Sequence, residues 1–383
     1  MSPPSIQDLL SERLRGSRGG ARGRSRGRRG HSSSTPSPSH DATIQGTDTD
    51  AAVSRMSAVD IGYLDDPFAQ FFVQVPTVGD IVRRLPIINR GTYTRTAALD
   101  RLIAAFLSGC EGQERQIISL GAGTDTRCFK LLSQPLQAGL IYHEIDFPAV
   151  SNKKRQLVSS IPPLRTIVPN AELTGDTWSN QHLPNGCQYW CHGLDLRDLL
   201  KDDVKSLRGV RTDVPTLLIS ECCLCYLEVP DADKIIEYFV NRIPSLSLVI
   251  YEPTNPMDPF GKQMVSNLAA RKIRMPTLEQ YTDIKKQETR LKDAGFESAK
   301  SSTIQKIWEQ WVPREEKERV DSLEGLDEVE EWNLLADHYL VGWGWRGGGT
   351  GRMGKGSTVI LKLSMSLMLA SRPISPNCQD TTS

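Results

Sequence analysis

A pair of glycines between two apolar runs constrains the fold more than any other feature of this sequence. The apolar run 117–120 enters the turn 121–126, a short helical pattern follows, and a second apolar run ends at Asp146. Glycine lets the backbone turn sharply out of a buried strand, and an acid after the next strand can hold a ribose diol. We therefore predict strand, glycine turn, helix and strand, with a nucleoside-binding crevice. The glycines alone would equally fit an ordinary tight turn, so the hypothesis depends on Asp146.

The chain beyond the turn alternates strand-like and helix-like patterns. Continuous apolar runs lie at 188–191, 216–221 and 246–251, and helical patterns occupy 149–158 and 231–242. Strands that alternate with helices form a parallel sheet with helices on both faces, and ligands bind at the carboxyl ends of the strands. The sequence therefore predicts an α/β protein.

Three acids fall at successive strand ends, namely Asp146, Asp195 and Glu221. Each could simply cap the helix that follows it, because acids are common at helix starts. Their recurrence on one edge of the predicted sheet favours a role in ligand binding.

The N-terminal segment differs in composition from the rest of the chain. Residues 1–40 hold eight Arg and no Lys against Asp8 and Glu12, which leaves 38 basic and 44 acidic residues in the remainder. Residues 1–50 are rich in Arg, Gly and Ser and cannot bury apolar surface, so we predict a disordered tail. Arg-Gly tracts can bind RNA, but a solvated extension is the hypothesis we favour.

Hydropathy indicates in which compartment the protein resides, and cysteine spacing indicates whether it binds a metal. No apolar run approaches the ~20 residues that cross a bilayer, and a signal core is missing, so we expect a cytoplasmic protein, with the nucleus as a second location. The eight cysteines show no disulfide framework. Two groups, Cys187 with Cys191 and Cys222 with Cys223 and Cys225, fit no zinc spacing, and we expect structural thiols and no metal.

Residues 51–115 show a helical pattern that Pro67, Pro76 and Pro86 interrupt before a better helix at 92–107. Such a lead-in commonly closes over a nucleotide crevice, so we predict that it acts as a cofactor lid. Arg90 and Arg95 flank the start of its last helix, and a fork of donors beside a cofactor turn suits a carboxylate.

The remaining segments extend the predicted core. Residues 116–255 form that core, and 256–345 add helices, a helix stop at Gly295 and a helix that runs into a last strand. His338 has no evident nucleophile partner and is interpreted as structural. Residues 346–383 are an atypical extension that we expect to be disordered.

The assembled motifs closely resemble the leucine carboxyl methyltransferases, in a fungal type with an Arg-Gly-rich tail. The resemblance covers residues 55 to 345 in the expected order, through stretches such as 58–63, 88–91, 120–123, 144–148, 195–198, 220–222, 260–264 and 337–339. It implies a Rossmann-like class I methyltransferase that uses S-adenosylmethionine. The glycine-rich segment and apolar end after Trp345 do not match.

The resemblance also implies a substrate and a set of site residues. The family methylates the C-terminal leucine carboxylate of the protein phosphatase 2A catalytic subunit, which regulates assembly of the phosphatase holoenzyme, and we expect a monomer without membrane contact. Arg95 would meet the cofactor's methionine carboxylate, Asp146 its ribose and Glu221 its amino group. Arg55, Gly121, Asp195 and Leu196 complete the implied cofactor set, and Arg90 and Tyr226 form the implied substrate set.

A carboxylate substrate changes what the enzyme must supply. It is already ionised at neutral pH, so it needs no general base before it attacks a methyl group, and no catalytic side chain is expected. The alternative is a methyltransferase that acts on a small-molecule hydroxyl or a tRNA base. A hydroxyl would usually require a base, for which His143 is the nearest candidate. Known tRNA-modifying relatives carry a long repeat domain, which we do not expect in this chain.

Overall fold

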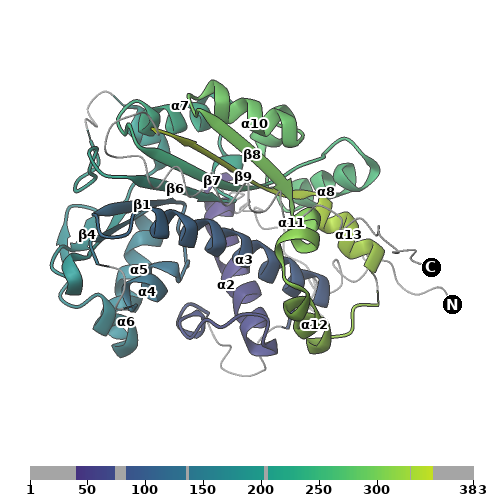
Figure 1. Cartoon of the computed structure of the whole chain (residues 1–383), viewed down its shortest axis with the longest axis horizontal. Helices are drawn as coiled ribbons and strands as arrows, with labels where there is room; N and C mark the ends of the chain where they lie inside the picture. The colour runs from purple at the N-terminus through teal and green to yellow at the C-terminus, as the bar shows by residue number, and fades with distance from the viewer. Residues whose placement is uncertain (1–39, 74–82, 135–137, 202–205, 328, 348–383) are drawn as a thin grey trace, which may run out of the picture. The chain divides into compact units, whose positions relative to one another are not determined.

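The computed structural model describes residues 40–73, 83–134, 138–201, 206–327 and 329–347. These residues form one sheet of nine strands in the order β3-β4-β5-β2-β1-β6-β7-β9-β8 (Figure 1). The strands are β1 (Arg115–Leu120), β2 (Leu140–Asp146), β3 (Glu172–Thr174), β4 (Thr177–Asn180), β5 (Gln188–Gly193), β6 (Thr216–Glu221), β7 (Leu246–Pro253), β8 (Ser298–Thr303) and β9 (Tyr339–Arg346).

Helices cover both faces of this sheet. In Figure 1, α7 and α10 lie on one side, and α3 and α5 lie on the other. The helices are α2 (His40–Ile61), α3 (Pro86–Gly109), α4 (Arg127–Leu132), α5 (Pro148–Ser160), α6 (Pro162–Ile167), α7 (Val229–Val240), α8 (Pro259–Ala270), α9 (Pro276–Gln280), α10 (Ile284–Asp293), α11 (Ile304–Trp311), α12 (Arg314–Leu323) and α13 (Val329–Asp337). Short 3-10 turns include η3 (Leu196–Leu200) and η4 (Leu224–Tyr226).

The order of the central strands places a ligand crevice. β1 pairs in parallel with β2 on one side and with β6 on the other. From β1 the chain builds outward to β2 and β5, and then returns across β1 to β6 and β7. The strand order therefore reverses between β1 and β6, and in such sheets ligands bind outside the carboxyl ends of the strands at this point.

The central strands read as continuous apolar runs because both of their faces are covered. Every residue of β1 and β7 is buried, and so are all but the last residues of β2 and β6. Strands in the interior of a parallel sheet lie between helices on both sides, so alternation between apolar and polar residues is not required. The strand predictions at 188–191, 216–221 and 246–251 are confirmed.

The sheet is only partly parallel, which corrects the sequence prediction. β9 is antiparallel to β7 and to β8, and β4 is antiparallel to both β3 and β5. Parallel pairing needs a crossover connection, whereas β3, β4 and β5 follow one another through short turns and therefore run antiparallel.

Three helix boundaries also differ from the prediction. α2 spans 40–61, so residues 40–50 belong to the folded body and not to the predicted tail. Pro86 was expected to interrupt the helical pattern, but α3 begins at this residue, because proline is well tolerated in the first turn of a helix. The helical segment before the predicted stop at Gly295 consists of two helices, α9 and α10, separated by Tyr281–Asp283, where Asp283 caps α10.

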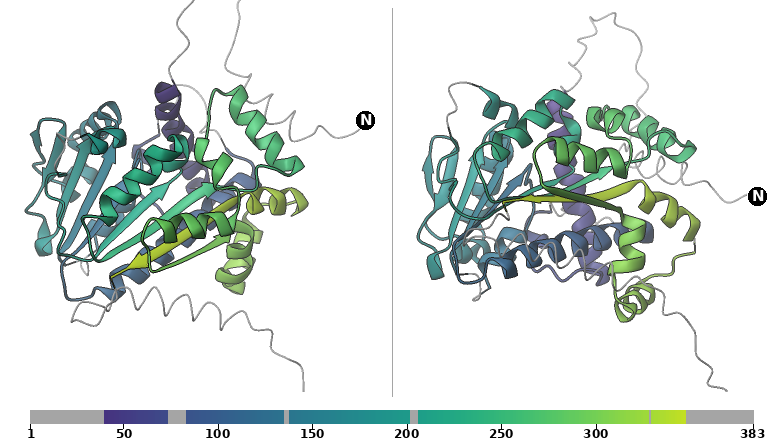
Figure 2. Two further views of the ribbon diagram at one scale, coloured as in Figure 1. Left: turned by 90° about the horizontal axis from the view of Figure 1, so that it is seen from above. Right: turned by 45° about the horizontal axis from the view of Figure 1, so that its top comes forward.

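α2 packs against α3, as the purple and blue helices of Figure 2 show. Within the described ranges, no helix is both long enough and apolar enough to cross a membrane. The predictions for residues 1–39 and 348–383 lie outside the part of the chain that the structure describes.

Candidate functional site

A cavity of about 420 Å³ lies at the carboxyl ends of the central strands, where the strand order reverses. Its size falls within the range of small-molecule and cofactor sites. Eight of the nine residues that the sequence analysis singled out line it, namely Arg55, Arg95, Gly121, Asp146, Asp195, Leu196, Glu221 and Tyr226.

The glycine turn adopts a backbone that other residues would strain. Gly121 has φ +60° and Gly123 has φ +48°, both in the left-handed region. A Cβ on Gly121 would lie 2.6 Å from Cys223 Sγ, and one on Gly123 would collide with the carboxylate of Asp48. The amide of Gly121 donates to Ile145 O at 2.8 Å, which ties the turn to the end of β2. Glycine is therefore required here by conformation and by close packing.

Asp146 is fixed at the end of β2 by two backbone amides. Gly123 N donates to its Oδ2 and Phe147 N to its Oδ1, each at 2.7 Å. Burial raises the pKa of Asp146 to about 6, although the two amides act in the opposite direction and Asp48 adds to the rise. The carboxylate thus faces the cavity and also supports the turn.

A chain of alternating charges crosses the cavity wall. Arg95 Nε lies 2.8 Å from Glu221 Oε1, and Arg127 Nη1 donates to Glu221 Oε2 at 2.6 Å. Arg127 also donates to Asp125 at 2.9 Å, and Arg55 Nη2 lies 3.4 Å from Asp125 on the other side. Each charged group in this row therefore has an opposite charge beside it, which offsets the cost of removing the charges from water.

The network keeps its carboxyl groups ionised. Burial alone would favour the neutral acid at Glu221, but Arg127 and Arg95 hold the pKa of that carboxyl below its usual value. Burial likewise opposes ionisation of Asp125, and Arg127 and Arg55 lower its pKa. The cavity wall thus presents a guanidinium at Arg95 next to a carboxylate at Glu221.

Asp195 combines the two roles that the sequence left open. It is the N-cap of η3, where its Oδ1 accepts from Arg197 N at 2.9 Å. It also lines the cavity beside Leu196, which is 8% exposed. Capping therefore does not exclude a ligand role here.

Apolar side chains also line the cavity. Ile87 from α3, Ile304 from the start of α11, and Trp332, Leu335 and Ala336 from α13 are among them. Tyr226 also lines the cavity, and its side chain shares a hydrogen bond with Thr47 of α2.

Arg90 lies outside the residues that line the cavity, which does not support its predicted substrate role. It is 6% exposed, pairs with Asp321 and lies over the rings of Trp308 and Trp332, 4.8 and 5.7 Å from their centroids. Successive helical residues are separated by about 100°, so residues five apart point about 140° from each other. Arg90 and Arg95 therefore cannot face the same side of α3.

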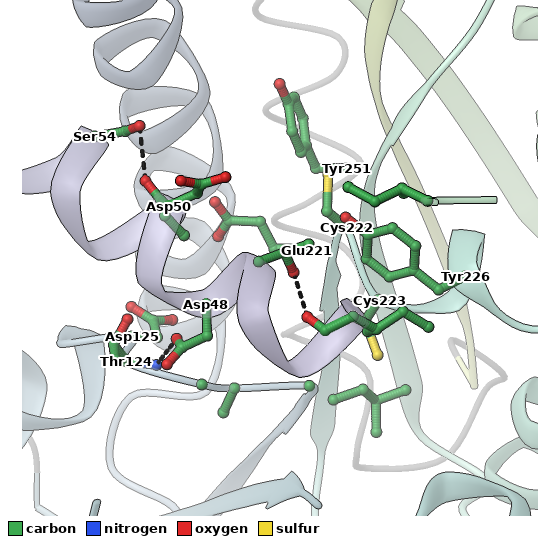
Figure 3. Close-up of a pocket in the computed structure, with 18 of the residues that line it drawn as sticks. Asp48, Asp50, Ser54, Thr124, Asp125, Glu221, Cys222, Cys223, Tyr226 and Tyr251 are labelled. Carbon is green, nitrogen blue, oxygen red and sulfur yellow. Dashed lines mark hydrogen bonds between the residues drawn. The ribbon is translucent and has the colours of Figure 1, made fainter. Parts of the chain in front are cut away.

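Two polar residues of the site were missed from sequence. Arg127 was read only as part of a short helix, yet it joins Asp100, Asp125 and Glu221. Asp48 was placed in the tail, yet its Oδ1 accepts from Thr124 N at 2.7 Å, as Figure 3 shows. The signal for Asp48 was its seven-residue spacing from Arg55, which puts both on one face of a helix.

The histidine and cysteine interpretations can also be compared with the structure. His143 is fully buried, lies beside the rings of Trp190 and His192 and does not line the cavity. The seven cysteines in the described ranges are free thiols, five of them buried. Cys222 and Cys223 line the cavity, so they are more accessible than a buried strand end would make them.

Comparisons with known proteins agree with this geometry. The sequence profile of the family described as leucine carboxyl methyltransferase matches residues 43–240. The leucine carboxyl methyltransferase 1 of Emericella nidulans is 44% identical over 378 residues, covering 91% of this chain and 96% of that protein. That of Aspergillus fumigatus is 46% identical over 389 residues, covering 91% and 95%. Human tRNA wybutosine-synthesizing protein 4 is 32% identical over 307 residues, but these are 78% of this chain and 43% of that protein.

Proposed function

The chain belongs to the leucine carboxyl methyltransferase family, and we propose that it methylates the C-terminal leucine carboxylate of the protein phosphatase 2A catalytic subunit. The methyl donor is S-adenosylmethionine. The observation that carries the proposal is a single cavity that joins a nucleoside-type glycine turn, a paired Arg95 and Glu221, and an apolar wall.

The cavity residues fit the donor's two polar ends. Asp146 can accept hydrogen bonds from ribose hydroxyls. Gly121 has no side chain, so the cofactor can approach the backbone of the turn closely. Arg95 offers donors to a carboxylate, whereas Glu221 offers an acceptor to an ammonium group. An α-amino acid group carries both of these charges, so an adjacent Arg and Glu complement it. When bound, S-adenosylmethionine supplies an electrophilic methyl group on a positively charged sulfur.

The apolar wall suits a leucine side chain. Ile87 of α3 and Trp332 and Leu335 of α13 all line the cavity, although the two helices lie far apart in sequence. Burial of apolar area contributes about 25 cal/mol per Å², so a leucine side chain would gain roughly 1.5–3 kcal/mol here. We expect the free C-terminal carboxylate of a leucine bound there to lie beside the methyl donor.

Methyl transfer to a carboxylate requires the protein to align the two substrates and to exclude water. The leucine carboxylate is ionised at neutral pH and needs no proton removed before it attacks. Attack joins an anion to a sulfonium cation, and a site that excludes water and aligns the groups favours such a step. The protein's task is therefore to orient the two substrates, which the walls contributed by α2, α3 and α13 can do.

The buried position of His143 disfavours the hydroxyl-methylating alternative. A general base must come within hydrogen-bonding reach of its proton, but His143 lies within β2, is fully buried and does not line the cavity. Burial also lowers the pKa of His143 well below its usual value, which weakens it as a base.

Methylation of purified phosphatase catalytic subunit tests the proposal. The subunit with its terminal leucine and a version without that leucine are each incubated with the enzyme and labelled S-adenosylmethionine. We expect label in the complete subunit only, in a form released by mild base as expected of an ester.

A parallel incubation with a protein-depleted extract covers the alternative. Label that enters small molecules or tRNA in that extract, with none in the phosphatase subunit, would overturn the assignment. Equal labelling of the complete and shortened subunits would place the methyl group elsewhere than on the terminal carboxylate.

A further inference from the structure

The N-terminal half of α2, residues 40–51, forms one wall of the cavity without being part of the core. Asp41, Ile44, Asp48 and Ala51 recur at intervals of three and four residues and all line the cavity. They therefore share one face of the helix. No residue of 40–51 is buried, whereas the buried residues of α2 begin at Ala52.

Charged contacts at the rim hold this segment in place. Asp41 lies 2.8 Å from Arg197 of η3, and Asp50 pairs with Arg84 at 3.4 Å and also with Arg271 at the end of α8. The side chains of these pairs are between 28% and 51% exposed. Ion pairs this exposed contribute roughly 0–1 kcal/mol each and are screened by salt. Such contacts can form and break while the core remains folded.

Asp48 makes a different contact, because it reaches the glycine turn itself. Its Oδ1 accepts from Thr124 N at 2.7 Å and would collide with a Cβ placed on Gly123. On the other side of the same turn, Gly123 N donates to Asp146. Two consecutive amides of the turn are thus held by two carboxylates, one from β2 and one from α2. In Figure 3 the Asp48 side chain points from the helix toward Thr124.

We propose that Asp48 is a positioning residue that fastens residues 40–51 across the cofactor turn and so sets the rate at which the cofactor enters and the demethylated product leaves. The proposal rests on the proposed use of S-adenosylmethionine. With the Asp48 contact made, the segment covers the turn. With the contact broken, the segment keeps its exposed rim pairs and the hydrogen bond between Thr47 and Tyr226 but loses its contact with the turn, so it should open more often.

We call a residue with this role, which fastens a segment over a site, a latch. A latch affects binding kinetics differently from a residue that contacts the ligand. Loss of a residue that only contacts the ligand mainly speeds dissociation and changes association little. Loss of a latch opens the path in both directions, so the association and dissociation rate constants rise together and their ratio changes little.

The test uses the full chain and S-adenosylhomocysteine as the probe. Rapid mixing followed by tryptophan fluorescence measures both rate constants for the wild type, Asp48→Ala, Asp48→Asn and a control, Asp60→Ala. Asp60 is an exposed acid on the same helix and does not line the cavity. We expect both rate constants to rise about tenfold in Asp48→Ala, consistent with loss of one charge-assisted hydrogen bond. Asp48→Asn keeps an acceptor oxygen and should rise less.

A salt series on the unmodified protein gives a measurement that needs no variant to fold. Screening of the rim pairs should speed both association and dissociation of S-adenosylhomocysteine as NaCl increases from about 0.05 to 0.5 M. Rates of Asp48→Ala that equal those of Asp60→Ala would overturn the latch. So would faster dissociation with unchanged association, because Asp48 would then be a ligand contact. A wild-type protein that binds no S-adenosylhomocysteine would overturn the proposed cofactor as well, whereas failure of the latch alone leaves binding intact.

Discussion

Arg95 and Glu221 face each other across the cavity wall, with Arg95 Nε 2.8 Å from Glu221 Oε1. The first comes from α3 and the second from the end of β6, so the fold brings together two charges that lie 126 residues apart in the sequence. Arg95 also lies over the ring of Tyr251, 5.3 Å from its centroid. These contacts pre-orient the guanidinium before a carboxylate arrives, which lowers the ordering cost of binding.

Arg95→Lys should weaken cofactor binding by roughly tenfold or more. A lysine ammonium is a point charge and cannot make two parallel bonds to a carboxylate while it also pairs with Glu221. Calorimetric titration with S-adenosylmethionine measures the effect, with Arg101→Lys as the matched control on the exposed side of the same helix. Equal affinities in the two variants would contradict the role of Arg95.

Asp146→Asn should also weaken cofactor binding, by about 1.5–3 kcal/mol or roughly ten- to a hundredfold. The amide keeps the shape of the side chain but removes the charged acceptor. It can accept from only one of the two amides that Asp146 now holds, Gly123 N and Phe147 N. Part of the loss would therefore come from a looser turn.

A thermal unfolding curve of the same variant separates these two effects. Asp213→Asn, at a highly exposed carboxyl on the surface, is the control for loss of charge. Unchanged cofactor affinity in a fully folded Asp146→Asn protein would remove Asp146 from the site.

The strand ends were predictable from sequence because burial and topology fix them together. Asp146, Asp195 and Glu221 each follow a continuous apolar run, and parallel strands bring such ends to one edge. The glycine turn was predictable for the same reason, since Gly121 must leave a buried strand at a positive φ.

The contribution of α2 was not predictable in the same way. Residues 40–50 are polar and bury no side chain, so their composition resembles the tail that precedes them. Their helix depends on partners distant in sequence, such as Arg197, Arg271 and the amide of Thr124. Tertiary contacts of this kind leave only a faint helical spacing in the sequence.

Cofactor affinity should fall as the pH drops below about 6. The pKa of Asp146 is raised to about 6 by burial, with Asp48 adding to the rise and the Gly123 and Phe147 amides and Lys154 opposing it. Protonation removes the charged acceptor, so affinity should decrease by at most tenfold per pH unit below that value. Titrations at pH 5 and 7 on the wild type and Asp146→Asn test this, because the variant should lack the dependence.

The same carboxyl should act on stability with the opposite sign. Its pKa is higher in the folded state than the ordinary 3.8, so the folded state binds the proton more tightly. The resulting stabilisation is fully present below about pH 3.8 and is lost as the pH rises to about 6. If the unfolding free energies of the wild type and Asp146→Asn change equally between pH 3.8 and 6, the raised pKa of Asp146 would be contradicted.

The buried pair His143 and His192 should destabilise the protein in acid. Burial lowers the pKa of His192 to about 4 from 6.5, and His143 Nδ1 lies 3.1 Å from His192 Nε2. A depressed histidine pKa means that the unfolded state binds the proton first, so stability is lost as the pH falls from 6.5 to about 4. One such group accounts for about 1.4 kcal/mol per pH unit across this window.

Urea unfolding from pH 7 to 4.5 on the wild type and His192→Gln measures this difference. The variant should show a shallower loss of unfolding free energy, by up to one proton, while His182→Gln at an exposed position serves as the control. Parallel curves for the wild type and His192→Gln would show that His192 titrates normally.

Truncation should distinguish the tail from the cavity wall. The sequence analysis favoured a solvated tail over residues 1–50, but α2 begins at His40, and Asp41, Ile44 and Gln45 line the cavity. We therefore expect deletion of 1–39 to leave the methylation rate and cofactor affinity within about twofold of the full chain.

Deletion of 1–51 removes Asp48 and the rim acids Asp41 and Asp50, and it should speed loss of the cofactor. The unfolding transition should stay cooperative, because the buried residues of α2 begin at Ala52. The methylation assay and the S-adenosylhomocysteine exchange assay on both truncations decide the matter: a large loss already at 1–39 would place a functional element within the Arg-Gly segment, and identical exchange rates in the two truncations would mean that residues 40–51 do not cover the site.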